Sequence, residues 1–491
     1  MQQPSIHINM EEKMLVFNQY LQRTNMDYKQ YQVDGLKWCL TNELREDPPA
    51  NTRGGFIADE MGLGKTILMI GLCLTNLIKR TLIVVPPVIL DQWYIQIYKT
   101  TGHRALVYHG AEKKQITVEQ LMKAHIVITT YGAICVSKTQ IAKKEFTLLH
   151  KVPWSRTIFD EGHHLRNSST SRYIGAKLLT SKIRWIVSGT PIQNKKSDFF
   201  NLCSLLKMPA SFYTDSNNLR TISKSFILKR TKAQVGIELP NIVIKDHLVN
   251  WKNTNEKVLS EEFHNSLFNF KKNKEHSNAY DLQLPNLAIL QRILYSRQSC
   301  IMPKLMVHNL IKLYNKGLIS NLEHYREAFQ YTSKLDSVID CIVSNRDNNK
   351  GKIVFCTYRE EIDTICKRLQ QKGMDSIAIY DGRTTNSQRL QILNNKNNVL
   401  ILQIQTGCEG INLQENYSEI YFVSPNWNPA IEDQAIARCH RIGQLNEVNV
   451  HRFKMTDFVD SEEENVGMSM DNYITCKQDF KRQIASDILD N

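Results

Sequence analysis

The chain has 491 residues and a formal net charge of +13 at pH 7; 42 % of its residues are hydrophobic and 23 % are charged. This length exceeds what one compact core holds and predicts two or three domains of ordinary globular composition. No apolar run reaches the roughly 18–20 residues that a membrane helix needs, and residues 1–13 lack the apolar segment of a secretory signal. We therefore expect no membrane partner and no secretion.

Eleven cysteines are spread along the chain, and no two of them form a Cys-x-x-Cys pair. An odd number without paired spacing predicts neither structural zinc nor a disulfide framework, so we expect reduced and mostly buried thiols. The positive charge suits a polyanionic partner such as nucleic acid. Because many basic proteins bind no nucleic acid, the charge is informative only beside specific motifs.

Short β-branched runs of strand length alternate with helix-length segments in the first half of the chain. These runs are residues 81–85, 125–129, 157–159 and 185–187. The alternation predicts a parallel sheet with crossover helices. It stops near Pro240, gives way to a polar stretch of helical character at 250–331, and then resumes. The later runs are residues 352–356, 376–380, 399–402 and 419–423.

The predicted fold is therefore α/β, with two parallel-sheet lobes and a helical insertion between them. The expected divisions are an N-terminal extension at 1–24, a first lobe at 25–245, a helical insertion and linker at 246–332, a second lobe at 333–455 and a C-terminal tail at 456–491. An acidic run at 461–464 is most simply a solvated stretch of that tail.

A glycine-rich segment at residues 59–66 is the strongest local signal. Its members are Asp59, Glu60, Met61, Gly62, Leu63, Gly64, Lys65 and Thr66. In phosphate-binding loops the glycines let backbone amides approach phosphate oxygens, the lysine reaches the β- and γ-phosphates, and the threonine hydroxyl binds Mg²⁺. The strict loop pattern needs a glycine where Asp59 stands, so a glycine-rich turn that opens a helix is the alternative interpretation.

Two adjacent carboxylates, Asp160 and Glu161, follow the strand-like run at 157–159. They would lie at the carboxyl edge of a parallel sheet, where ligands bind in such folds. We predict that Asp160 binds Mg²⁺ and that Glu161 orients or deprotonates the attacking water. The four-residue pattern Asp-Glu-x-His alone is common by chance, but its position after the glycine-rich segment, also at a strand end, makes coincidence a weak explanation.

Gln434, Arg438 and Arg441 are spaced i, i+4 and i+7, which places them on one face if the segment is helical. Two guanidinium groups on one face suit the charge of a transferring γ-phosphoryl group. Because they belong to the second lobe, hydrolysis would require both lobes to close on the nucleotide. We predict nucleotide contact by Gln434 and a catalytic role for both arginines; a basic solvated helix face is the alternative.

Taken in order, these motifs resemble the SWI/SNF-type DNA translocases, within the helicase-like superfamily that carries DExH boxes. The resemblance runs from about Tyr28 to Phe453. The further matching segments are 31–38, 83–87 with Trp93, 129–131, 160–167, 188–194, 228–232, 294–305, 381–382 with Arg389, 406–413, 427–429 and 434–444. In its compactness the chain is similar to short viral members of that family.

The resemblance implies two RecA-like lobes, ATP and Mg²⁺ as cofactors, and adenine recognition by Gln32. It also implies that Trp93 and the segments 83–87 and 129–131 hold the DNA backbone. Segment 188–194 would couple the γ-phosphate to the DNA side, and the basic segment 228–232 would close the first lobe. Glu409 is acidic where the family commonly has a small or apolar residue, which leaves its contact with a DNA strand open.

The predicted function is that of an ATP-dependent double-stranded DNA translocase, an enzyme that cleaves the β–γ phosphoanhydride bond of ATP. The resemblance implies a role in transcription regulation or remodelling of chromatin and other DNA–protein complexes, with double-stranded DNA and chromatin or the transcription machinery as partners. It implies that the protein acts in the nucleus, which would be the host nucleus if the chain is viral. A cytoplasmic location is the alternative. A strand-separating helicase and a non-enzymatic DNA-binding transcription cofactor are the alternatives, and the presence of every expected catalytic side chain disfavours the second.

Overall fold

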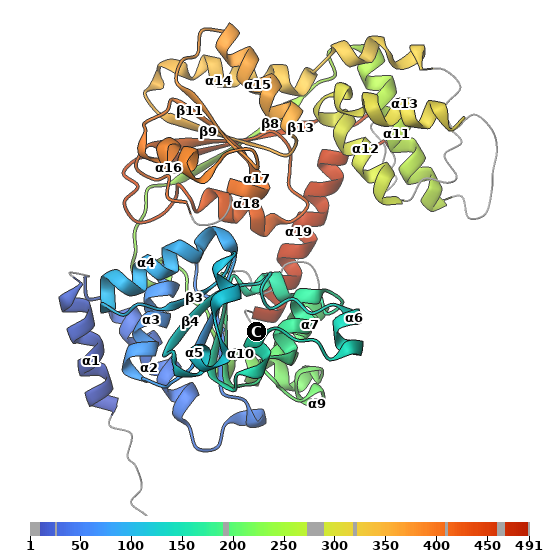
Figure 1. Ribbon diagram of the computed structural model, residues 1–491. Helices are drawn as coiled ribbons and strands as arrows, with labels where there is room; N and C mark the ends of the chain where they lie inside the picture. Colours follow the sequence, from blue (N-terminus) through green and yellow to red (C-terminus); the bar gives the residue numbers. More distant parts are fainter. Residues whose placement is uncertain are drawn as a thin grey trace, which may run out of the picture. The chain divides into compact units, whose positions relative to one another are not determined.

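The β-branched runs of the first half form one parallel sheet in the computed structural model (Figure 1). The structure describes residues 10–24, 27–189, 196–272, 289–317, 322–407, 411–458 and 467–489. The chain divides into two compact units: Met1–Glu238 with Lys481–Asn491, and Leu239–Phe480. Within the described ranges, no helix combines the length and apolar character that crossing a bilayer requires.

The first unit is built on a seven-stranded sheet in the order β3-β4-β2-β5-β6-β1-β7. Every pairing in it is parallel. The strands are β1 (Gly54–Ile57), β2 (Thr81–Val85), β3 (Leu106–Tyr108), β4 (Ile126–Thr130), β5 (Trp154–Asp160), β6 (Ser181–Val187) and β7 (Ile227–Leu228). Because all strands run in one direction, the loops after β5, β6, β1 and β7 emerge side by side at one edge.

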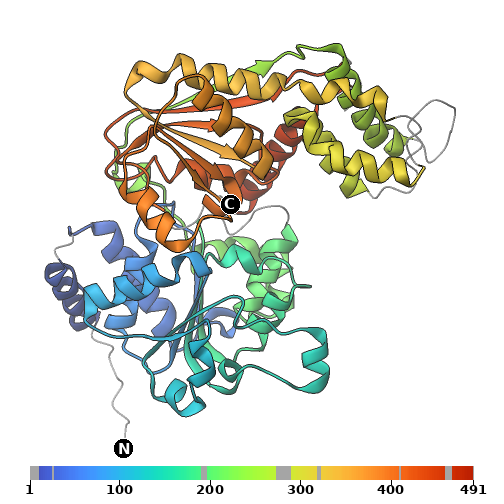
Figure 2. The ribbon, with the colours of Figure 1, turned by 45° about the horizontal axis from the view of Figure 1, so that its top comes forward.

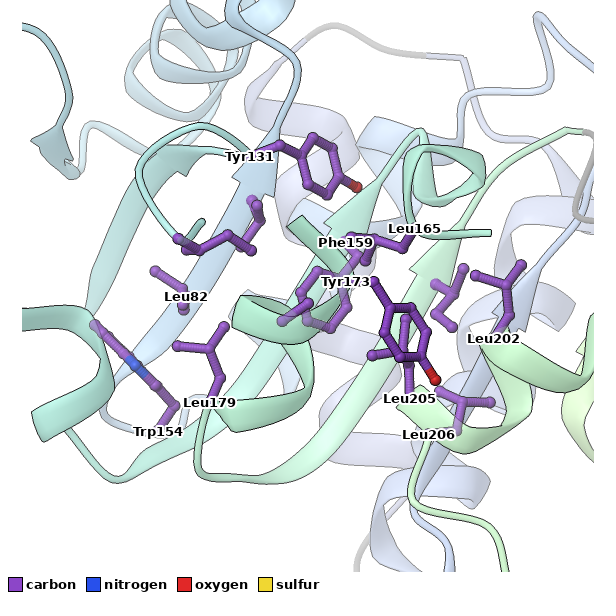
Figure 3. Packing of buried hydrophobic residues seen from close by; sticks show 14 of the residues in the cluster. Leu82, Tyr131, Trp154, Phe159, Leu165, Tyr173, Leu179, Leu202, Leu205 and Leu206 are labelled. Carbon is purple, nitrogen blue, oxygen red and sulfur yellow. The ribbon is translucent and has the colours of Figure 1, made fainter. Parts of the chain in front are cut away.

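Alternating strand residues bury the two faces of this sheet against different helices. Ile83 and Ile158 face a core formed with α1 (Met10–Arg23), α2 (Gln30–Leu44), α3 (Lys65–Thr75) and α4 (Leu90–Thr101). The other face packs on α5 (Val118–Lys123), α7 (Ser171–Leu178), α8 (Lys196–Leu205) and α10 (Leu219–Phe226), and Figure 3 shows Phe159, Tyr173 and Leu202 within that core. Two short helices, α6 (Lys138–Lys143) and α9 (Ala210–Tyr213), complete the unit.

A buried ion pair fixes α2 on the sheet. The Glu43 carboxylate at the end of α2 accepts from Nε and Nη2 of Arg156 on β5, at 2.6 and 2.5 Å, and both side chains are fully buried. Trp185 on β6 and Asn76 donate to the same carboxylate, at 2.8 and 2.7 Å. With its oxygens satisfied in this way, the buried charge is compensated, and the helix that carries Gln32 is held in place.

The second unit is built on a six-stranded parallel sheet in the order β10-β11-β9-β12-β13-β8. The strands are β8 (Ile242–Val249), β9 (Gly351–Cys356), β10 (Ile377–Tyr380), β11 (Val399–Gln403), β12 (Tyr417–Phe422) and β13 (Val448–Met455). One face packs on α14 (Ser333–Ser344), α15 (Arg359–Gln371) and α19 (Met470–Leu489). The other packs on α18 (Pro429–Ile436), with α16 (Asn386–Asn394) and α17 (Ile404–Gly407) nearby (Figure 1).

The insertion in the second unit has a small core of its own. It consists of α11 (Thr254–Lys272), α12 (Ile289–Ile301) and α13 (Val307–Asn315), whose ribbons are drawn in Figure 2. These helices bury Phe263 and Leu310 together. These features confirm the prediction of an α/β protein with two RecA-like parallel-sheet lobes and a helical insertion.

The structure differs from the expected domain divisions at three places: the end of the first lobe and the two terminal segments. β8 pairs with β13 over eight register positions and belongs to the second sheet, so the first lobe ends before 245 and the strand pattern continues past Pro240. As an exposed edge strand interrupted by Lys245, Asp246 and His247, β8 lacks the continuous β-branched run that marks the buried strands.

Both expected terminal extensions also contribute to cores. α1 of the segment 1–24 buries Phe17 in the first unit, and α19 of the segment 456–491 buries Met470 and Ile474 in the second. The acidic run at 461–464 lies outside the described residues.

Candidate functional site

The glycine-rich segment forms the loop between β1 and α3. Gly62 and Gly64 have φ angles of 94° and 80°, and Gly64 directly precedes the first residue of α3, Lys65. A Cβ on Gly64 would lie 2.5 Å from Nε2 of Gln32, whose amide also donates to the Leu63 carbonyl at 3.4 Å. The left-handed backbone therefore favours glycine, and a side chain here would also displace the Gln32 amide. Binding of phosphate groups by the backbone amides of this loop and of the start of α3 stays a prediction.

The side chain of Lys65 folds back over this loop. Its Nζ donates to the carbonyl oxygens of Asp59 and Glu60, at 2.9 and 3.4 Å. Thr66 follows in the first turn of α3 and is half-buried. Met61 stands beside Gly189 at the end of β6, where a Cβ would be 3.3 Å from Cγ of Met61. The structure thus brings the predicted residues 59–66 together with Gln32.

Arg230, in the basic segment just after β7, clamps the glycine-rich loop by pairing with Asp59. Arg230 donates to both carboxylate oxygens of Asp59, from Nε at 3.0 Å and from Nη2 at 2.5 Å, and Asp59 is 1 % exposed. Its Nη1 also donates to the Tyr31 carbonyl. Lys232 binds Glu60 through both its backbone N–H and its Nζ, at 2.8 and 2.7 Å. Asp59 and Glu60 are therefore structural anchors of the loop in this unit.

The Asp160–Glu161 pair lies at the end of β5, two strands from β1 in the same sheet. Asp160 accepts from the Trp93 indole at 2.7 Å and from the Glu161 backbone N–H at 2.9 Å. Glu161 has a left-handed backbone (φ 49°, ψ 48°), and a Cβ on the following Gly162 would lie 2.4 Å from the Ile186 side chain. This strained turn sets the direction in which Glu161 leaves the strand.

Burial, reinforced by the adjacent Glu161 charge, raises the pKa of Asp160 to about 7, against the opposing effects of the Trp93 hydrogen bond and the Lys65 charge. Glu161 contacts His163, with Oε2 3.2 Å from Nδ1. The two adjacent carboxylates are hard oxygen donors, as is the hydroxyl of Thr66 in the loop that follows β1, and a raised carboxyl pKa indicates a shortage of positive charge. The residues present therefore fit a Mg²⁺ ion.

The end of β6 joins these elements. The Ser188 backbone N–H donates to Ile57 O at 3.0 Å, and its Oγ lies 3.3 Å from Nδ1 of His163. A Cβ on Gly189 would be 3.5 Å from Nζ of Lys65. Ser188 and Gly189 begin the segment 188–194, for which the family resemblance implies a coupling role; residues 190–195 lie outside the described part of the chain, as does Glu409.

Two residues expected at the DNA backbone are buried beside Asp160 instead. Trp93 is 1 % exposed and Tyr131 is 2 % exposed, and the Tyr131 hydroxyl donates to the Asp160 carbonyl at 2.7 Å. The Trp93 indole therefore contacts the Asp160 carboxylate and the Tyr131 hydroxyl contacts the Asp160 main chain, and neither buried side chain is presented to a DNA backbone. Sequence reasoning missed this role, and it also missed the Arg230 clamp, because partners so distant in sequence leave no local pattern.

The predicted helix through Gln434, Arg438 and Arg441 is wrong, because α18 ends at Ile436. Beyond it the chain tightens into turns, with Arg438 N bonded to Ala435 O at 3.2 Å and the Arg438 carbonyl accepting from Leu413 N at 3.0 Å. Because the helix ends before Arg438, the side chains of Gln434, Arg438 and Arg441 do not share one helical face.

The two arginines nevertheless lie close to each other in the second unit. Burial and the charge of Arg438 lower the pKa of Arg441, and Nη1 of Arg441 donates to Oδ1 of Asn412. Gln434 is more deeply buried than the two arginines, with 3 % of its surface exposed. Nucleotide contact by Gln434 stays a prediction.

Comparison with known families gives two matches along the chain. The SNF2-related domain matches residues 31–305, and the helicase conserved C-terminal domain matches residues 333–443. The first match includes Gln32, the glycine-rich loop and the Asp160–Glu161 pair, and the second includes Arg438 and Arg441.

Individual relatives cover most of this chain. An "Uncharacterized ATP-dependent helicase" of Mycoplasma pneumoniae is 28 % identical over 86 % of the chain, which spans only 39 % of that protein. A "Probable global transactivator" of Orgyia pseudotsugata multicapsid polyhedrosis virus is 25 % identical over 94 % of the chain and 91 % of its own length. A solved Sulfolobus solfataricus SWI2/SNF2 ATPase core in complex with dsDNA is 22 % identical, with a TM-score of 0.39 over 94 % of this chain and 93 % of that one.

The Arg230 clamp predicts a specific loss in an Arg230→Ala variant. Removing the guanidinium leaves the Asp59 carboxylate buried without its ion-pair partner, which costs about 3–5 kcal/mol for such pairs. We expect faster amide hydrogen exchange across residues 58–64 and a lower free energy of unfolding. Lys224→Ala, at an exposed position of α10 in the same unit, is the matched control and should change stability by less than about 0.5 kcal/mol. Unchanged exchange in Arg230→Ala would show that the clamp does not hold the loop.

Proposed function

The chain belongs to the SNF2-related family of helicase-like proteins, and from this premise we propose that it is an ATP-dependent translocase on double-stranded DNA. The observation that carries the proposal is the gathering of Lys65 and Thr66, which follow β1, with Asp160 and Glu161, at the end of β5, along one edge of the same parallel sheet. This is the residue set that positions a nucleoside triphosphate and a water molecule for phosphoryl transfer.

Each side chain has a separate task in the proposed reaction. Lys65, held by loop carbonyls 2.9 and 3.4 Å away, exchanges those contacts for the β- and γ-phosphate oxygens. Thr66 and Asp160 hold Mg²⁺, which when bound neutralises charge on the phosphates. Glu161 orients the attacking water or removes its proton, and its His163 contact fixes its direction. Gln32, packed against Gly64, recognises the adenine.

In the proposed mechanism the second unit adds two arginine side chains to the positive charge of Lys65. In this proposal Arg438 and Arg441 act as arginine fingers, so that hydrolysis depends on the relative movement of the two lobes. Burial, and then the neighbouring charge of Arg438, lower the pKa of Arg441, and an anion bound beside the two guanidinium groups would favour their charged forms.

Double-stranded DNA is the proposed track. The net charge of +13 suits a phosphate backbone, and contacts to phosphates alone carry no sequence information. Binding is therefore expected to be sequence-tolerant and salt-sensitive. The viral transactivator and the chromatin-remodelling protein SYD of Arabidopsis thaliana among the relatives support action on chromatin or the transcription machinery in a nucleus, the host nucleus if the chain is viral.

We expect ATP hydrolysis that is slow for the protein alone and rises when double-stranded DNA is added. In Glu161→Gln, the amide keeps the shape of the side chain but cannot accept the proton, so turnover should fall by about 10²–10⁴-fold with ATP affinity retained. Glu112→Gln, on an exposed 3-10 turn of the same unit, should behave like the wild-type protein. The measurement is phosphate release beside nucleotide affinity, and near-normal turnover in Glu161→Gln would remove Glu161 from its assigned role.

Arg438 and Arg441 are expected to act in hydrolysis and not in DNA binding. Arg441→Ala should reduce turnover on the order of 10³-fold or more, as for other arginine fingers. DNA and ATP affinities should change far less, because the contact strengthens mainly in the transition state. Arg346→Ala, at an exposed position of the same unit, is the control. A large loss of DNA affinity, with hydrolysis recovering at saturating DNA, would instead assign Arg441 to the nucleic-acid surface.

A further inference from the structure

Three potential metal ligands meet at one edge of the second sheet, away from the residues assigned to nucleotide chemistry. His247 lies on the edge strand β8, His451 on the adjacent β13, and Cys341 on α14. The His247 Nε2 and His451 Nδ1 atoms are 3.0 Å apart, and Cys341 Sγ is 3.6 Å from the same Nδ1. All three ligand atoms lie within 4.8 Å of one another.

The imidazole at the centre of this cluster is held rigidly. His451 is 2 % exposed and stacks on the ring of Tyr421 (centroids 4.5 Å apart, planes at 5°), while His247 meets its edge through the 3.0 Å contact between Nε2 and Nδ1. Its Nε2 is buried without a hydrogen-bond partner in the described part of the chain. The polar contacts of this buried ring are thus made through Nδ1, the atom that faces His247 and Cys341.

We infer that His247, Cys341 and His451 form a binding site for a zinc-class divalent cation. Around a tetrahedral Zn²⁺, bond lengths of about 2.0–2.1 Å to nitrogen and about 2.3 Å to sulfur separate the ligand atoms by about 3.3–3.6 Å. The 3.0 and 3.6 Å separations observed are close to these values. Imidazole nitrogen with thiolate is a ligand set that suits zinc and not Mg²⁺, and a water molecule would complete the tetrahedron.

The remaining charges around the site largely balance. Lys245 and Lys352 oppose a cation, whereas Glu419, 3.5 Å from Lys352 Nζ, favours one. Burial and Glu419 raise the pKa of the Cys341 thiol to about 11, so metal binding must release its proton to solvent as the sulfur–metal bond forms. Because His247 and Cys341 are only half-buried, an ion can enter from solvent.

Such an ion would fasten β8 to its sheet. β8 is an edge strand that pairs only with β13, and it begins just after the point where the two compact units divide. A metal shared by β8, β13 and α14 would stabilise this entry strand, because the ion binds the folded unit and not the unfolded chain. The site shares no residue with the nucleotide chemistry, so its test is independent of the proposed function.

The test is Co²⁺ titration of the untagged, metal-stripped full-length chain in a non-thiol reductant. We expect a sulfur-to-cobalt charge-transfer band that saturates at one Co²⁺ per chain, and a melting temperature that Zn²⁺ raises. Cys341→Ser should lose both effects, whereas Cys476→Ser, at an exposed cysteine on α19, should keep them. His247→Ala, at the half-buried edge position, should weaken Co²⁺ binding by at least 10-fold while circular dichroism reports an intact fold.

Three results would overturn the inference. The first is the absence of a charge-transfer band in the wild-type protein, which would leave the three residues as a hydrogen-bonded cluster only. The second is a band of equal strength in folded His247→Ala and Cys341→Ser. The third is loss of the band in Cys476→Ser, which would mark an adventitious ion on an exposed thiol. Should Cys341→Ser fail to fold, the wild-type, His247→Ala and Cys476→Ser titrations still decide the question.

Discussion

The buried ion pair between Arg230 and Asp59 is the interaction on which the first unit's site depends. It is bidentate, at 3.0 and 2.5 Å, and the same guanidinium also binds the Tyr31 carbonyl. One side chain thus connects the segment after β7, the glycine-rich loop and the helix that carries Gln32. A buried carboxylate is stable only with such compensation, so the loop is held in shape by the protein itself. Preorganisation of this kind lets a site stabilise developing charge without rearranging during the reaction.

Charge is distributed unevenly between the anchors and the reacting groups. Asp59 and Glu60 are neutralised by Arg230 and Lys232. Asp160 instead stands beside Glu161, and the pKa of Asp160 rises to about 7 through burial and that neighbouring charge. The first pair shapes the loop, while the second is suited to a cation and a water molecule. The proposed zinc site of the second unit uses different ligands, since imidazoles and a thiol replace the carboxylates.

Local patterns predicted the two sheets, the glycine-rich loop and the carboxylate pair, because buried parallel strands are continuous apolar runs and their carboxyl ends collect ligand groups. The patterns did not predict β8, because it is an exposed edge strand with Lys245, Asp246 and His247 at its centre. The helical periodicity after Gln434 was misleading, because the chain tightens into turns beyond Ile436. Partners far apart in the sequence leave no local pattern, and His247 and His451 are 204 residues apart. The prediction of no structural zinc relied on the absence of Cys-x-x-Cys pairs, and that spacing does not detect a site of this kind.

In the proposed mechanism, ATP hydrolysis moves this protein along an intact duplex. The decisive measurement is displacement of a third strand from a triplex, made beside a measurement of strand separation in the underlying duplex. We predict that the wild-type protein releases the third strand only with ATP, that the duplex stays paired, and that Lys65→Ala, which lacks the phosphate-binding ammonium group, releases none. Separation of the duplex strands would identify a strand-separating helicase. Equal third-strand release by Lys65→Ala, or without ATP, would contradict an ATP-driven translocase and leave DNA binding alone.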